Sequence, residues 1–333
     1  MRMRQAIVAA LADEMDADPR VVLLGEDVGA AGGVFKTTEG LFDRFGAQRV
    51  RDTPIAEMGF LGAAVGAASA GLRPVVEIMF AEFLGVALDQ VVTEAANLRY
   101  LSRGEYTAPL VVRCSAGPGL GFGAQHSQTL ESWLINTPGL KVVAPSGAQS
   151  AYGLLRAAIR DEDPVVFLEP RILYGDREDV DTALALPELG RARIVRTGAD
   201  VTVVALGQTV PTALAAADLG SIDAEVVDLQ TISPVDRDTI LDSVRRTRRL
   251  AIVEANPWTG GWGTGIAADV ATELFGELRA PVLRITSPDI PVPYSRALES
   301  RYVPDAGYVS SQIAHLIANN RVPTPWWKEI VDA

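Results

Sequence analysis

The 333-residue chain contains a single cysteine, only two histidines and no apolar run long enough to cross a membrane. One cysteine, Cys114, allows no intrachain disulfide, which favours a reducing compartment. It lies in the apolar run 110–114, so we expect it to serve packing and not as a nucleophile. Cysteine and histidine spacings typical of metal ligands are also absent. The apolar stretch 6–12 is too short for a signal peptide, so we expect a cytoplasmic protein.

Positive charge is scarce as well. The net charge is −12 and the isoelectric point is near 4.8. Binding to nucleic acid requires clustered lysine and arginine, so the composition argues against such a partner. The stretch 58–72 holds 15 uncharged residues, short of the ~20 that a membrane span needs. We therefore expect no membrane contact and interpret this stretch as a core or interface helix.

Apolar runs alternate with helical patterns in two separate parts of the chain. In the first part we expect strands at 21–24, 75–80, 110–112, 141–144 and 165–168, and helices near 3–16, 57–71, 84–102 and 147–160. In the second part we expect strands at 201–206, 225–229, 250–254 and 282–285, and helices near 208–219, 236–247 and 263–278. Strands that alternate with helices of this length predict parallel sheets covered by helices.

Between the two parts the pattern breaks into charged residues and scattered prolines, which are typical of a connecting segment. The sequence therefore predicts an α/β fold of two domains, residues 1–175 and 198–333, joined by a linker at 176–197.

One acid, Glu57, leads directly into a helix rich in glycine and alanine. We expect its carboxylate to be buried, and burial of a charge needs an explanation such as function. The alternative is that Glu57 only complements the free N–H groups of the first helical turn. Along the same helix, small residues form a smooth face that lets another helix approach, from this chain or from a partner: Gly62, Ala63, Gly66, Ala67 and Ala70.

Two glycine-rich segments, 117–123 and 260–265, resemble phosphate-binding loops only weakly, because neither has the strand-to-helix context that such loops require. Flexible loops are the simpler interpretation. His126, next to the first segment, could carry protons near neutral pH or could be satisfied by the loop backbone. Glu26 ends the first expected strand, where open α/β sheets gather ligands, although capping of the following loop explains it equally well.

Taken in order, the motifs resemble those of the β subunit of the thiamine-diphosphate-dependent E1 component of 2-oxo acid dehydrogenase complexes. The resemblance covers nearly the whole chain. It rests on Gly25-Glu26-Asp27-Val28, Asp52-Thr53-Pro54-Ile55-Ala56-Glu57-Met58-Gly59, Gly71-Leu72-Arg73-Pro74, Asp89-Gln90, Gln125-His126-Ser127-Gln128, Pro138-Gly139-Leu140-Lys141-Val142-Val143, Ile159-Arg160-Asp161, Glu254-Ala255 and Pro291-Val292-Pro293.

The resemblance implies a pyrimidine-binding domain for thiamine diphosphate, followed by a domain like the C-terminal domain of transketolase. It implies that Glu57 hydrogen-bonds N1′ of the aminopyrimidine and promotes the tautomer that activates the cofactor. By the same resemblance Ile55, Met79 and Phe83 contact the pyrimidine ring, and Glu26 lies near it. His126 would act on the substrate and on transfer to the lipoyl group.

A structural potassium ion is also implied, held by backbone carbonyls. The matching residues are Leu110, Ala158, Ile159, Asp161 and Asp163, the last in place of a more usual asparagine.

The chain has no Gly-Asp-Gly motif, which in this family begins the site for the Mg²⁺ ion that holds the diphosphate. An E1 α subunit would therefore supply the other half of the site, in an α2β2 heterotetramer that serves the lipoyl domain and acyltransferase core of an E2 component. The resemblance thus implies an oxidoreductase that decarboxylates a 2-oxo acid. Pyruvate ranks slightly before branched-chain 2-oxo acids and acetoin. Two alternatives stay open: a transketolase-like carboligase split over two chains, and a non-catalytic subunit that tethers α to the E2 core.

Overall fold

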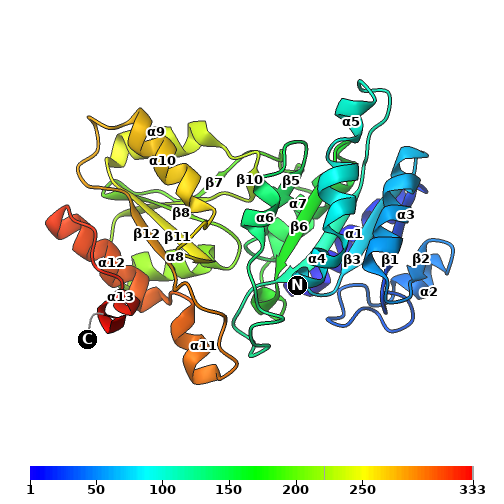
Figure 1. The fold of residues 1–333 in the computed structure, drawn as a ribbon, viewed down its shortest axis with the longest axis horizontal. Coiled ribbons are helices and arrows are strands. Elements are labelled where there is room, and N and C mark those ends of the chain that lie inside the picture. The colour runs from blue at the N-terminus through cyan, green and yellow to red at the C-terminus, as the bar shows by residue number, and fades with distance from the viewer. Residues whose placement is uncertain (221, 332–333) are drawn as a thin grey trace. The chain divides into compact units, whose positions relative to one another are not determined.

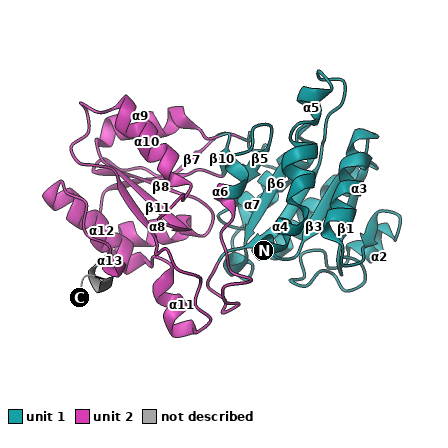
Figure 2. Ribbon diagram, viewed as in Figure 1, with its two compact units in different colours: residues 1–117, 133–189, 231–234 teal, residues 118–132, 190–230, 235–333 magenta. Residues whose placement is uncertain are grey.

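The computed structural model describes residues 1–220 and 222–331. The chain divides into two compact units (Figures 1 and 2). Unit 1 comprises residues 1–117, 133–189 and 231–234, and unit 2 comprises residues 118–132, 190–230 and 235–333. The segment 118–132, which we expected within the first domain, thus belongs to unit 2, and the short segment 231–234 returns to unit 1. The domain boundaries stay a prediction.

Unit 1 is built on a seven-stranded sheet in the order β10-β5-β6-β4-β3-β1-β2 (Figure 1). All pairings are parallel except that of β10 with β5. The strands are β1 (Val21–Gly25), β2 (Val50–Asp52), β3 (Arg73–Ile78), β4 (Val111–Ala116), β5 (Lys141–Val143), β6 (Val165–Pro170) and β10 (Thr231–Ser233). The central strands β3, β4 and β6 are buried almost throughout, as expected for a parallel sheet with both faces covered.

Helices connect these strands and cover the sheet. They are α1 (Met3–Ala17), α2 (Leu41–Phe45), α3 (Glu57–Ser69), η1 (Ala81–Phe83), α4 (Leu84–Asp89), η2 (Gln90–Ala95), α5 (Leu98–Leu101), α7 (Ala148–Arg160) and η3 (Arg171–Leu173), with α6 (Glu131–Ile135) at the boundary of the two units. Helices α1 and α7 pack against each other, and their apolar side chains join those of the sheet in one hydrophobic core.

The helix that we expected over 84–102 is broken into α4, the π-helical η2 and α5. A π-turn shifts the hydrogen-bond register and frees backbone carbonyls. The side-chain amide of Asn97 donates to two of these, the carbonyls of Val92 and Thr93, each at 3.0 Å. This local polar side chain therefore stabilises the break.

Unit 2 is built on a five-stranded sheet in the order β12-β11-β8-β9-β7, parallel except for the pairing of β7 with β9. Its strands are β7 (Arg193–Arg196), β8 (Val201–Ala205), β9 (Ala224–Asp228), β11 (Leu250–Pro257) and β12 (Leu283–Ser287), and its helices are α8 (Thr209–Leu219), α9 (Arg237–Thr247), α10 (Gly263–Glu273), α11 (Arg296–Tyr302), α12 (Ala306–Asn319) and α13 (Trp326–Val331). Acidic side chains cap two of these helices: Asp236 accepts from Thr239 N, and Asp305 from Tyr308 N.

Every strand expected from an apolar run is present, and the mostly parallel α/β fold is confirmed. The sequence missed the short strands β2, β7 and β10. Strand β7 lies inside the segment 176–197, which we interpreted as a linker, so part of this segment joins a sheet. This strand is partly exposed and carries two arginines, so no apolar run marks it. Within the described residues, no helix combines the length and the apolar character needed to cross a membrane.

Candidate functional site

The carboxyl ends of β1, β2 and β3 lie side by side in unit 1. Gly25, the last residue of β1, pairs with Asp52 of β2 and with Glu77 of β3. Glu26 follows β1 at once, and Glu57 begins α3 after the short connection from β2. In open α/β sheets this edge is where ligands bind. The fold therefore places both acids at the favoured position.

Glu26 is half-buried, and its pKa is raised first by burial and then by the negative charges of Glu57 and Asp27. The two glutamates are thus close enough for their charges to interact. Within residues 1–220 and 222–331, the buried Oε1 atom of Glu26 has no hydrogen-bond partner, and neither does the buried hydroxyl of Thr53. Polar atoms left unpaired in a protein interior are costly. They mark a position where an added donor or acceptor would be stabilised.

Glu57 is only half-buried, so the expectation that its carboxylate is buried was too strong for this chain alone. The physical reason is the exposure of its neighbours: Ile55 is 85% and Met58 is 56% exposed. The described part of the chain does not cover this side of α3. Its position in the first turn places the side chain near the free N–H groups of the helix start, which are positively polarised.

The three apolar residues expected around a ring lie near the carboxyl ends of β2 and β3. Ile55 precedes α3, Met79 directly follows β3, and Phe83 lies in η1, where its ring is 5.6 Å from that of Phe80. Met79 and Phe83 are half-buried. Carboxylates with apolar side chains nearby suit a flat heterocycle that has polar edges and apolar faces. Sequence reasoning missed Thr53, which lies in the motif around Glu57 and whose buried hydroxyl has no hydrogen-bond partner among the described residues.

The small-residue face of α3 is partly used within the chain. Gly62 packs against the side chain of Gln90, since a Cβ at this glycine would lie 2.6 Å from Gln90 Oε1. Ala63, Gly66 and Ala70 are exposed, and a Cβ at Gly66 would meet no atom within 4 Å. This part of the face is open to another element.

Beneath the site, a buried ion cluster joins three neighbouring strands. Arg113 on β4 donates from Nε and Nη2 to Glu169 on β6, at 2.7 and 3.1 Å, and from Nη1 to Glu77 on β3, at 3.0 Å. The hydroxyl of Tyr174 also donates to Glu169, at 2.6 Å. Burial raises the pKa of Glu77, and the positive charge of Arg113 opposes this rise. Glu77, which interrupts an apolar strand in the sequence, thus has a charged partner on the neighbouring strand.

Carboxylates of the chain itself occupy backbone amides of both glycine-rich segments. The N–H groups of Gly119 and Gly121 each donate at 2.8 Å to the carboxylate of Glu299. In the second segment, the N–H of Gly263 donates at 2.9 Å to the buried Glu254. A phosphate would have to displace these charges, so the structure favours the simpler interpretation of both segments as loops.

His126 lies in the segment 118–132 of unit 2 and is half-buried. Its backbone N–H donates to the carbonyl of Gly123 at 3.3 Å, which closes a tight turn. Glu26, Ile55, Glu57, Met79 and Phe83 all belong to unit 1. The predicted site residues therefore come from both units.

The carbonyls expected to bind potassium lie around the end of α7 and at the start of β4. Those of Ile159 and Asp161 each accept a hydrogen bond from Arg73 Nη1 at 3.0 Å, and the ammonium of Lys141 binds the Asp161 carboxylate at 2.6 and 2.8 Å. The end of a helix attracts cations. Each carbonyl has a second lone pair, but Arg73 and Lys141 already bring positive charge to these groups, and the potassium site stays a prediction. Among the described residues, no three His, Cys, Asp or Glu side chains form a metal-binding group.

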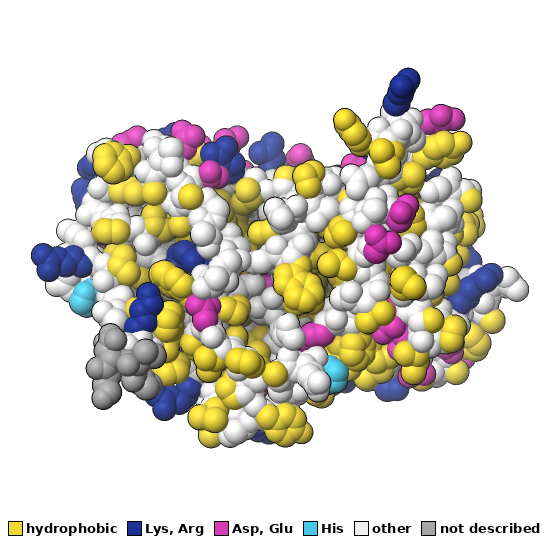
Figure 3. Space-filling model, viewed as in Figure 1, with side chains coloured by type: hydrophobic (Ala, Val, Ile, Leu, Met, Phe, Trp, Pro, Cys, Tyr) yellow, Lys and Arg dark blue, Asp and Glu magenta, His cyan; other side chains and the backbone are white. Residues whose placement is uncertain are grey.

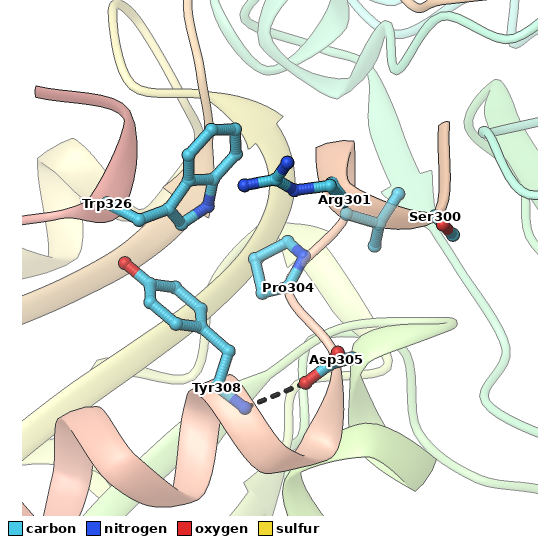
Figure 4. Close-up of a pocket in the computed structure, with 7 residues that line it drawn as sticks. Ser300, Arg301, Pro304, Asp305, Tyr308 and Trp326 are labelled. Carbon is cyan, nitrogen blue, oxygen red and sulfur yellow. Dashed lines mark hydrogen bonds between the residues drawn. The ribbon is translucent and has the colours of Figure 1, made fainter. Parts of the chain in front are cut away.

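A separate pocket of about 200 Å³ lies in unit 2, where Arg301 stacks over Trp326 at 5.2 Å from the ring centre (Figure 4). The pocket is lined by Ser300, Arg301, Val303, Pro304, Asp305, Tyr308 and Trp326. Binding sites for small molecules usually measure ~300–1,000 Å³. The pocket is smaller than this, and none of the predicted site residues lines it. Apolar side chains gather over α11 (Figure 3). Leu298 of this helix is 56% exposed.

Comparisons with known proteins agree with the two-unit architecture. Residues 1–177 match the transketolase pyrimidine-binding domain, and residues 190–309 match the transketolase C-terminal domain. The chain is 48% identical to the pyruvate dehydrogenase E1 component subunit beta-2 of Oryza sativa, over 91% of this chain and 83% of that protein. It is 46% identical to the 3-methyl-2-oxobutanoate dehydrogenase subunit beta of Mycobacterium tuberculosis, over 91% and 88%. It is 44% identical to the acetoin:2,6-dichlorophenolindophenol oxidoreductase subunit beta of Cupriavidus necator, over 93% and 96%.

Among solved structures, a split-gene transketolase described as an inactive β4 tetramer shares the fold, with a TM-score of 0.78 over 96% of this chain and 99% of that chain. The sequence identity is 24%, so this likeness concerns the fold alone. A transketolase from Leishmania mexicana gives a TM-score of 0.71 at 17% identity, over 98% of this chain and 47% of that one.

Proposed function

We propose a division of labour for this chain, which belongs to the family of E1 β subunits of thiamine-diphosphate-dependent 2-oxo acid dehydrogenases. In this proposal the chain binds the pyrimidine half of the cofactor at the carboxyl edge of the unit 1 sheet, and an E1 α subunit binds the diphosphate half. The observation that carries the proposal is the Glu26–Glu57 pair, with an unpaired buried oxygen on Glu26.

The residues at this edge fit the aminopyrimidine of thiamine diphosphate. Glu57 would accept a hydrogen bond from protonated N1′, and Ile55, Met79 and Phe83 would contact the ring. Glu26 would supply the second polar contact. When bound, the cofactor supplies the carbon nucleophile and the electron sink that decarboxylation of a 2-oxo acid requires. In this proposal Glu57 holds the proton at N1′. A partner subunit that closed the site would lower the local dielectric and so strengthen that hydrogen bond.

The α subunit would contribute the Mg²⁺ site in an α2β2 heterotetramer, since this chain has no Gly-Asp-Gly motif. The exposed Ile55 and Met58 and the open face at Gly66 are the surface that such a partner would cover. We further propose that the assembly passes its acyl product to the lipoyl domain of an E2 component, with His126 acting on the substrate and in this transfer. A cytoplasmic location stays a prediction.

Pyruvate is the substrate that we propose first. The relatives named above act, by their names, on pyruvate, 3-methyl-2-oxobutanoate or acetoin, and their identities to this chain differ by only a few per cent. Dye reduction by the reconstituted αβ complex with each of the three compounds decides among them. A highest kcat/KM for another of the three would overturn the choice of pyruvate.

The central test replaces Glu57 by Gln in the reconstituted αβ complex, with thiamine diphosphate and Mg²⁺ present. Glutamine keeps the size of the side chain but cannot hold the proton at N1′. We expect turnover to fall by about 10²- to 10⁴-fold, the usual contribution of a positioned proton-transfer group. The matched control is Glu105→Gln, which changes an exposed acid after α5 and should leave turnover unchanged. Full turnover of Glu57→Gln would refute the catalytic assignment and favour an assembly subunit. Ligation of sugars without lipoyl acylation would favour the split carboligase.

Potassium binding has a readout of its own. If the carbonyls near the end of α7 hold the ion, the thermal unfolding temperature of unit 1 should rise in potassium chloride relative to choline chloride at equal ionic strength. Equal unfolding temperatures in the two salts would argue against the site.

A further inference from the structure

The glycine-rich loop before His126 is fastened to α11 by one carboxylate. Glu299 accepts from the N–H of Gly119 through Oε1 and from the N–H of Gly121 through Oε2, both at 2.8 Å. Its side chain is buried, and the residue is 3% exposed. Hydrogen bonds between an ionised carboxylate and backbone N–H groups are stronger than those between neutral groups. The carboxylate therefore fixes two alternate residues of the loop at once.

The loop needs such a fastening, because its own backbone gives it little rigidity. Gly119, Gly121 and Gly123 all have positive φ angles, of 115°, 76° and 69°. Glycine has more conformational freedom than any other residue, so a segment with glycine at alternate positions does not hold one shape by itself. Tyr294 adds a second contact, since a Cβ at Gly123 would lie 2.7 Å from Tyr294 Cδ2.

The fastened loop leads directly to His126. The carbonyl of Gly123 accepts the N–H of His126, and the side chain of Gln128 donates to the carbonyl of Ala124 at 3.0 Å. The backbone of His126 is therefore one turn away from the residues that Glu299 holds. All of these residues belong to unit 2.

We propose that Glu299 is a positioning residue for His126: it fixes the glycine-rich loop so that the imidazole is presented in one orientation to the substrate and the lipoyl group. This inference rests on the proposed role of His126. Glu299 touches neither substrate nor cofactor in the proposal and acts only through the loop. A small misplacement of a reacting group is enough to slow catalysis by about 10²-fold.

The test is a double-mutant cycle in the reconstituted αβ complex with thiamine diphosphate and Mg²⁺. The variants are Glu299→Gln, His126→Ala and the double variant. In Glu299→Gln an amide NH₂ replaces one carboxylate oxygen and opposes an N–H donor of the loop, so one of the two bonds is lost. We expect reductive acylation of the lipoyl domain to fall by about 10- to 100-fold. In the His126→Ala background the same change should have almost no further effect.

The matched control is Asp305→Asn, which alters another carboxylate of unit 2 that accepts a backbone N–H, that of Tyr308 at 2.7 Å. It should leave acylation unchanged. Binding of the α subunit and thermal unfolding show whether each variant is folded, and Glu299→Asp, which keeps the charge, should recover part of the rate.

Each outcome decides a separate question. If His126→Ala keeps the full rate, the proposed role of His126 fails, and this inference fails with it. If His126→Ala is slow but Glu299→Gln is not, the inference is wrong while the proposed function stands. If the two losses multiply in the double variant, Glu299 acts on the fold and not through His126, which also overturns the inference.

Discussion

Replacement of Arg113 by methionine should destabilise unit 1 severely, because the guanidinium of Arg113 binds both Glu77 and Glu169. Arg113 and Glu169 are each 1% exposed, and Glu77 is 6% exposed. The substitution removes three hydrogen bonds of 2.7 to 3.1 Å and leaves two carboxylates buried. Breaking a buried ion pair on one side typically costs ~3–5 kcal/mol. We expect a loss of this size in the free energy of unfolding.

The loss of unfolding free energy should also depend on pH, and the pKa of Glu77 determines whether it grows or shrinks as the pH rises. Burial raises the pKa of Glu77 above its ordinary value of 4.5, so the folded state keeps a proton to higher pH than the unfolded state. The free energy of unfolding therefore falls as pH rises through this window. Removal of Arg113 removes the opposing positive charge and extends the window upward. Each additional proton held by the folded variant makes the deficit grow by ~1.4 kcal/mol per pH unit.

Calorimetry of the isolated chain at about pH 5.5 and about pH 8 measures both effects. The triple variant Arg113→Met, Glu77→Gln, Glu169→Gln is the control, because it removes the uncompensated charges and should recover most of the loss. A deficit below ~1 kcal/mol, or one that is equal at the two pH values, would refute the reasoning.

Three further predictions follow from individual contacts. Gly139→Ala should lower the free energy of unfolding, measured by urea titration, by more than ~2 kcal/mol, because the added Cβ would lie 2.2 Å from the carbonyl oxygen of Ala96. The control is Gly40→Ala, also at positive φ but with no atom within 4 Å of the added Cβ, which should cost only ~1 kcal/mol. Equal costs for the two variants would contradict this prediction. Burial raises the pKa of the Cys114 thiol, so mass spectrometry should find no alkylation by iodoacetamide at neutral pH until the chain unfolds. Glu26→Gln should raise the unfolding temperature of the isolated chain at neutral pH, because the pKa of Glu26 is raised in the folded state and its ionisation there is unfavourable. Calorimetry measures this rise. The same variant should bind thiamine diphosphate more weakly in the αβ complex, as measured by titration.

Much of the fold could be predicted from the sequence, because a parallel strand buried on both faces consists of a continuous run of apolar residues. The strands β3, β4 and β6 are of this kind. The short edge strands β2, β7 and β10 could not be predicted, because their pairing with a neighbour, and not their composition, makes them strands. The break at η2 was missed for a similar reason, since it depends on the hydrogen bonds of Asn97 to Val92 and Thr93.

The candidate site divides in the same way. Glu26, Glu57 and His126 could be chosen from the sequence, because each belongs to a local motif whose residues are neighbours along the chain. The closeness of Glu26 to Glu57 required the register of β1 and β2, and the exposure of Ile55 and Met58 required the whole surface of the unit.

The sequence by itself determined the family and the alternation of strands and helices, and it lacks the Gly-Asp-Gly motif, which is why we propose that another chain supplies half of the site. The tertiary structure decided which distant groups satisfy one another. Glu299 lies 180 residues from Gly119 and yet holds its loop, and Glu77, Arg113 and Glu169 meet only because their strands are neighbours in the sheet. Local preferences follow from adjacent residues, whereas burial and the pairing of charges depend on which parts of the chain fold against each other.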